Sequence, residues 1–176
     1  MRYFILENDP VFKDLPLLND WGSKISPALI RRGQTRRLPF RELIHVYPNQ
    51  NVVFNGIIIK PFMLLTKEIK DIVSKYQSGI VYKEIVLLET KIEVSQLYYL
   101  AVLEEIDCLH ESTVFNRVKT RIEKPVLIYE TIKDHSLFEI AGTKSTHYIV
   151  RLDLAESLLR RGVRGLKLTQ VELFVH

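Results

Sequence analysis

The pattern of hydrophobic and polar positions predicts one amphipathic helix most clearly, beginning after Thr66. Its apolar residues follow the i, i+3, i+4, i+7 spacing of a single helix face: Ile69, Ile72, Val73 and Tyr76. Thr66 is a favoured N-cap residue, and Gly79 is a favoured residue just beyond a helix C-terminus. We therefore expect a helix between these two residues that buries one face.

Two long apolar segments follow that helix and predict the centre of a sheet. Residues 80–88 and 97–103 are rich in strand-forming side chains, and a short, mostly polar stretch connects them. Strands joined by so short a connection pair in antiparallel fashion.

Shorter patterns predict the remaining elements. Apolar runs predict strands at 3–6, 43–47, 52–59, 126–131, 137–140, 147–150 and 168–174. Ser26 followed by Pro27 predicts the start of a short helix. Asp153 with Glu156 predicts a capping box for a helix at 154–161. The whole chain therefore reads as one α+β domain, with a mainly antiparallel sheet and three or four helices packed on it.

Composition narrows the class of protein. At 176 residues the chain is long enough for one domain with its own core, and 47% hydrophobic with 26% charged residues is typical of a globular protein. The single cysteine, Cys108, excludes an internal disulfide and a cysteine-only metal site. No uncharged run approaches 18 residues, so we expect a cytoplasmic protein without a membrane partner.

Charge is unevenly distributed along the chain. Residues 21–47 carry six Lys and Arg against one acid, whereas residues 84–111 carry seven acids against one Lys. The residues that stand out are Arg31, Arg32, Arg36 and Arg37 in the basic segment and Glu104, Glu105, Asp107 and Glu111 in the acidic segment. Two such poles can steer a charged partner, pair with each other, or remain solvated.

The acidic segment leaves a catalytic alternative open. Cys108 and His110 are two residues apart, so a strand would direct both side chains to one face, where a thiol and an imidazole can form a nucleophile pair. A cysteine after a long apolar strand is also typical of a small buried side chain. The neighbouring carboxylates lack the Asp/Asn/Gly loop of calcium and magnesium sites. We expect no catalytic residue, metal or cofactor, with a small hydrolase as the alternative.

A second alternative is a nucleic-acid-binding module that uses the arginines between Arg31 and Arg41 to neutralise phosphates. Only Phe40 and Tyr47 accompany them, so base stacking has little support. A solvated basic loop, or a contact surface for an acidic protein, is favoured over nucleic acid. Trp21, the only tryptophan, fits either a core position or an interface anchor.

Several segments resemble the immunity proteins of bacterial polymorphic toxin systems, a family first catalogued as a domain of unknown function. The similar segments are Phe62 to Lys70, the Tyr98-Tyr-Leu strand with the following Asp107, Arg151-Leu-Asp153, and the stretch from Gly165 to Leu173. The similarity covers about residues 60–175. It implies a non-catalytic protein that binds and neutralises a cognate toxin, and it brings no catalytic residues with it. The candidate contacts are Trp21 with the four arginines, or the four carboxylates.

Overall fold

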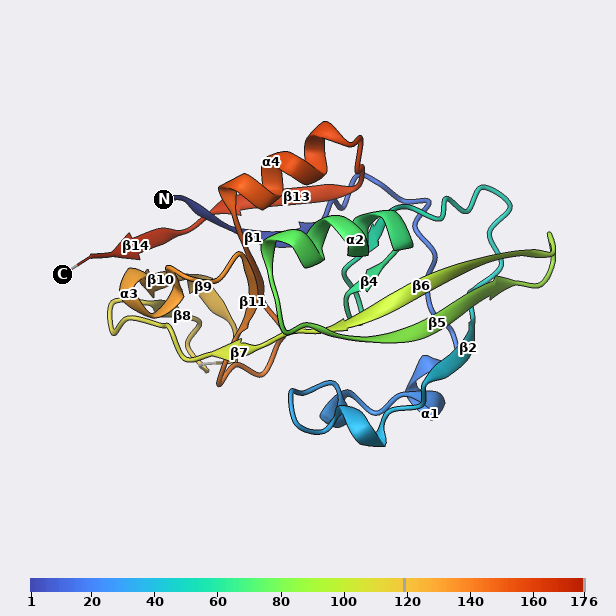
Figure 1. Ribbon diagram of the computed structural model, residues 1–176, viewed down its shortest axis with the longest axis horizontal. Helices are drawn as coiled ribbons and strands as arrows, with labels where there is room; N and C mark the ends of the chain where they lie inside the picture. Colours follow the sequence, from blue (N-terminus) through green and yellow to red (C-terminus); the bar gives the residue numbers. More distant parts are fainter. Residues whose placement is uncertain (119, 176) are drawn as a thin grey trace.

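Two five-stranded sheets form the framework of the protein, in a computed structural model that describes residues 1–118 and 120–175 (Figure 1). Within these residues, four α-helices and two pairs of short strands complete a single α+β fold. The predicted fold class is confirmed. Both five-stranded sheets are nevertheless mixed, because in these residues each contains one parallel strand pair, and one of the two short pairs is parallel as well.

The first sheet has the strand order β13-β1-β12-β11-β7. Its members are β1 (Tyr3–Asn8), β7 (Glu105–Ile106), β11 (Leu137–Ile140), β12 (Tyr148–Arg151) and β13 (Leu166–Gln170). Neighbouring strands are antiparallel except for β11 and β7. The sheet thus gathers strands from both ends of the chain.

The second sheet has the order β2-β5-β6-β4-β3. Its members are β2 (Arg41–His45), β3 (Ile57–Ile58), β4 (Leu64–Leu65), β5 (Val81–Glu89) and β6 (Val94–Val102). The central β5 and β6 form the predicted antiparallel pair, whereas β2 joins β5 in parallel. The predicted strand at 52–59 is wrong outside β3, because Val53 hydrogen-bonds instead to Asp14 of the N-terminal loop.

Helix α2 (Lys67–Tyr76) is the predicted amphipathic helix. Its Ile69, Ile72 and Val73 are buried, but Tyr76 is exposed. Thr66 occupies the N-cap position, yet its buried side chain makes no capping hydrogen bond, so the predicted hydroxyl cap is wrong. The helix is therefore held by its buried face rather than by its cap.

Helix α4 (Leu152–Arg160) begins two residues earlier than predicted, with Arg151 as N-cap. The predicted capping box does not form. Asp153 lies in the first turn, where its carboxylate accepts hydrogen bonds from the Arg151 guanidinium and the Leu154 backbone N–H, each 2.9 Å long. Glu156 instead lies 3.6 Å from the Arg160 guanidinium, one turn further along the helix.

Helices α2 and α4 lie together over one side of the molecule and join the two sheets into one core (Figure 1). This core combines residues of both helices with residues of both sheets: Leu6, Leu65, Ile69, Ile72, Val73, Leu103, Val150, Leu154 and Leu158. Burial of such a set stabilises the arrangement of the sheets by tens of kcal/mol before the entropy cost is counted. The two sheets thus share one packed core.

Several predicted elements are shorter than expected. Ser26 and Pro27 begin only a 3-10 turn (Pro27–Leu29), which follows α1 (Trp21–Lys24) and precedes a second 3-10 turn (Thr35–Arg37). The strand predicted at 126–131 ends at Ile128, where the short helix α3 (Tyr129–Ile132) begins.

A small layer of short strands covers part of one face of the first sheet. Its members are β8 (Val114–Phe115), β9 (Ile122–Lys124), β10 (Val126–Ile128) and β14 (Glu172–Phe174). The single strand predicted at 168–174 is divided at Val171, after which the chain leaves the first sheet and pairs in parallel with β10. Beneath this layer Tyr3, Phe138 and Ile149 are fully buried.

Candidate functional site

The basic and acidic segments of the chain meet in space. The arginines lie on the loop between α1 and β2, and the glutamates lie where the chain leaves β6 of the second sheet and enters β7 of the first. Arg32 Nη1 is 2.6 Å from Glu104 Oε2, and Arg31 Nε is 3.7 Å from Glu105 Oε1. We call these four residues the charged seam.

The charged seam is open to solvent. The side chains of Arg31 and Arg32 are 60% and 54% exposed, and those of Glu105 and Glu104 are 32% and 41% exposed. Ion pairs with this exposure contribute only about 0–1 kcal/mol to stability. The seam can therefore exchange its internal pairs for those of a partner at little cost in folding free energy.

Two titratable residues lie beside the seam, and the sequence reasoning missed both. His135 Nε2 is 3.7 Å from Glu104 Oε2, and its Nδ1 is buried without a hydrogen-bond partner among the described residues. Glu139 stands opposite Glu105 on the parallel strand β11. Glu139 could have been identified only from the pairing of β7 with β11, which no local sequence pattern encodes.

The pKa of Glu139 is shifted toward neutrality. Burial raises the pKa of its carboxyl to about 7, and the negative charge of Glu105 acts in the same direction. A hydrogen bond from Thr146 and the positive charge of Arg31 oppose the shift. The net charge beside the seam therefore changes near neutral pH.

The other predicted charged residues lie outside the seam. Arg36 and Arg37 belong to the second 3-10 turn, and Asp107 and Glu111 follow β7; all four are exposed. Over residues 1–118 and 120–175, none of the four takes part in an ion pair. The structure thus brings together only half of the predicted charged set, and it leaves unpaired charge of both signs on flanking segments.

Trp21 packs against the core of the second sheet. It is half-buried at the start of α1, and its ring meets Phe62 edge-on, with centroids 5.7 Å apart. An aromatic contact of this kind accounts for the residue by packing alone.

Cys108 and His110 occupy different environments. Cys108 is fully buried, and burial raises the pKa of its thiol to about 12, with Asp107 adding to the shift. The His110 ring stacks on Phe174 at 3.9 Å between centroids, and its Nδ1 is 2.7 Å from Ser112 Oγ. A thiol so placed stays protonated and is a poor nucleophile.

No group of three or more His, Cys, Asp or Glu side chains in the described part of the chain is arranged to hold a metal ion. Nor is any helix among those residues long and apolar enough to cross a membrane.

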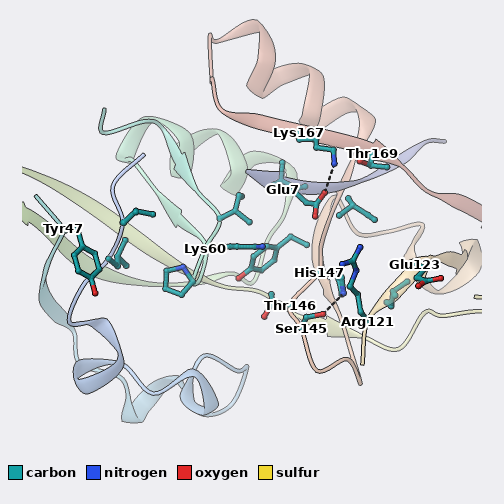
Figure 2. Close-up of a pocket in the computed structure, with 18 residues that line it drawn as sticks. Glu7, Tyr47, Lys60, Arg121, Glu123, Ser145, Thr146, His147, Lys167 and Thr169 are labelled. Atoms are coloured by element: carbon teal, nitrogen blue, oxygen red, sulfur yellow. Dashed lines mark hydrogen bonds and ion pairs between the residues drawn. The ribbon is translucent and has the colours of Figure 1, made fainter. Parts of the chain in front are cut away.

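A groove of about 960 Å³ crosses the molecule, and none of its lining residues belongs to the charged seam (Figure 2). Its charged and titratable lining includes Glu7, Lys60, Arg121, His147 and Lys167. The sequence reasoning missed this set, because its members come from five separate segments that only the strand register and the fold bring together. We call it the central groove.

Comparison with known proteins adds no relative. No protein-family model matches the sequence, and no curated protein matches it.

Proposed function

We propose that the protein binds a partner protein, a bacterial toxin, through the charged seam and neutralises it by occlusion. The observation that carries the proposal is the meeting of the two oppositely charged segments at Arg31–Glu105 and Arg32–Glu104. The toxin class rests on the sequence resemblance to immunity proteins, and the docking surface rests on this geometry.

A surface of mixed sign favours a protein partner over nucleic acid. Two of the four predicted arginines lie beside carboxylates, so the seam presents both signs of charge rather than a purely cationic pad for phosphates. Glu104 and Glu105 are likewise partly neutralised, so a uniformly basic partner has to displace Arg31 and Arg32. A partner that presents charges of both signs is complementary without such displacement.

The weakness of the internal pairs suits tight and selective docking. Each seam side chain is at least about a third exposed, so partner groups can reach it, and the exposed Arg36, Arg37, Asp107 and Glu111 extend the charged area. Complementary charge over such an area raises association rates and rejects partners of the wrong pattern. An interface of the usual size buries roughly 1,200–2,000 Å².

The test begins with the reading frame immediately upstream of the gene, whose product is expressed with and without this protein. We expect that product to be toxic alone and tolerated when the two are co-expressed, and a complex measurable by calorimetry. Reversal of Glu105 and Glu111 to Lys should weaken the complex by about 2 kcal/mol or more if a pair is desolvated.

A charge swap supplies the matched control. Arg31→Glu combined with Glu105→Arg keeps the internal pair but inverts the surface pattern, so folding should be retained while partner binding is lost. Wild-type affinity in the swapped variant would remove the seam from the interface. A harmless upstream product with no measurable binding would remove the toxin assignment.

A further inference from the structure

The small layer of short strands leaves one end of a face of the first sheet uncovered. This uncovered end forms the floor of the central groove. The small layer of β8, β9, β10 and β14 covers Tyr3 and Ile149 on that face. Further along β1, Glu7 pairs in register with Lys167 of β13. On the other side of β1, His147 directly precedes Tyr148, the first residue of β12, which pairs with Leu6. Polar residues thus replace apolar ones where the cover ends.

The charges in the central groove are not balanced. Glu7 Oε2 lies 3.6 Å from Lys167 Nζ, so the one acid at the centre already has a cation. Lys60, Arg121 and a second acid, Glu123, also line the groove, and none of these three forms an ion pair within residues 1–118 and 120–175. The lining thus carries three cations against two acids. Figure 2 shows Arg121 beside His147, and Lys60 in the middle of the groove.

Both excess cations of the groove act on His147. Burial is the largest cause that lowers the pKa of its imidazole, Glu7 opposes the shift, and Lys60 and Arg121 add smaller effects in the same direction as burial. Ser145 Oγ lies 2.9 Å from His147 Nε2. An anionic group placed between Lys60 and Arg121 would relieve this excess.

The shape of the central groove fits an extended chain better than a compact ligand. It runs from Tyr47 at one end to Glu123 at the other (Figure 2). A second hollow of about 410 Å³ shares the lining residues Ile5, Glu123 and Thr169 and continues along β13. Sites for small molecules are usually enclosed and bury most of the ligand, whereas a long open trough suits an extended segment of polypeptide.

We propose that the central groove binds an extended segment of a partner protein whose central residue is acidic, with the carboxylate between Lys60 and Arg121. Apolar side chains on either side of that residue would pack on Ile5, Ile59 and Pro61, which also line the groove. The groove shares no lining residue with the charged seam, so this proposal stands apart from toxin binding.

The probe is a phage-displayed library of random heptapeptides, selected on the folded protein at low salt. We expect the selected peptides to carry Asp or Glu flanked by apolar residues. Their affinity, measured by fluorescence anisotropy on synthetic copies, should fall about tenfold or more in the double variant Lys60→Glu, Arg121→Glu. The control is Lys91→Glu, an exposed lysine in the β5–β6 turn, which should leave affinity unchanged.

Two further measurements decide the outcome. Titration of the His147 imidazole by NMR should show its pKa rising when the peptide binds, because a carboxylate offsets the nearby cations. The same titration with inorganic phosphate and adenosine monophosphate tests a small anion as the occupant. Selected peptides without acidic residues, affinity unaffected by the double variant, or tight binding of the phosphates alone would each overturn the proposal.

Discussion

Glu105 and Glu139 stand directly opposite each other on the parallel strands β7 and β11, so two carboxylates share one site beside the charged seam. Burial together with Glu105 raises the pKa of Glu139 to about 7. An unfolded glutamate titrates near 4.3, so between these two values the folded protein holds a proton that the unfolded chain has lost. Folding stability therefore falls as pH rises through this window.

The first prediction is that replacing Glu139 by Gln removes this pH dependence. Above about pH 7, the raised pKa of Glu139 lowers the free energy of unfolding of the wild type by its full amount. A shift of this size corresponds to roughly 3 kcal/mol. Urea unfolding of both proteins between pH 4 and pH 8 should show that the free energy of unfolding of the variant increases relative to that of the wild type as pH rises. A constant difference between the two across this range would contradict the shift.

The second prediction concerns the strength of the charged seam. Arg32→Ala should lower the free energy of unfolding by less than about 1 kcal/mol, because both partners of its 2.6 Å contact with Glu104 are largely exposed. A double-mutant cycle with Glu104→Ala, measured by denaturant unfolding at low and high salt, isolates the pair. A coupling energy above 2 kcal/mol would show that the pair is a structural element.

The third prediction is that Cys108 reacts with a thiol reagent only when the protein opens. The thiol is fully buried and its pKa is raised to about 12, so little thiolate exists in the folded state at neutral pH. Labelling with Ellman's reagent should be slow and should accelerate with urea in step with unfolding. Rapid labelling of the native protein would support the catalytic alternative.

The Cys108→Ala, His110→Ala double variant completes that test. We expect it to fold, with a loss of about 1 kcal/mol from the thiol site, and to retain any biological protection. Loss of protection by a folded variant would contradict a role without catalysis.

The fourth prediction separates backbone strain from steric contact at two glycines. Gly165 and Gly142 have nearly equal positive φ, +72° and +74°, but an added Cβ at Gly165 would lie 3.1 Å from Asn55 Nδ2 and 3.2 Å from the Phe12 ring. Around Gly142 there is open space. Ala at Gly142 should cost about 1 kcal/mol, and Ala at Gly165 about 2 kcal/mol. Equal melting temperatures for the two variants would show that the neighbours move freely.

The elements with strong local signals were predictable from sequence. Helix α2 and the β5–β6 pair have apolar periodicity long enough to specify them. The predictions failed where tertiary contacts decide. Val171 carries no local signal that would divide one apolar run between two sheets, and Thr66 has a capping side chain that the fold buries.

The candidate site was predictable as a set of residues but not as an arrangement. The two charged segments are evident from composition, whereas the pairing of Arg31 with Glu105 depends on how the loop after α1 folds against β7. The central groove gave no signal at all, because Lys60, Arg121 and His147 are unremarkable residues until the fold gathers them.

The charged seam also constrains how descendants of this chain can diversify. Arg31 is joined to Glu105 and Arg32 to Glu104, so a reversal of sign at one position sets two like charges side by side. Such a single change alters the surface and replaces a weak attraction by a weak repulsion, whereas a reciprocal change alters the surface alone. If the seam is the docking surface that we propose, a change of partner should favour paired substitutions, in which arginine and glutamate exchange positions between the two segments.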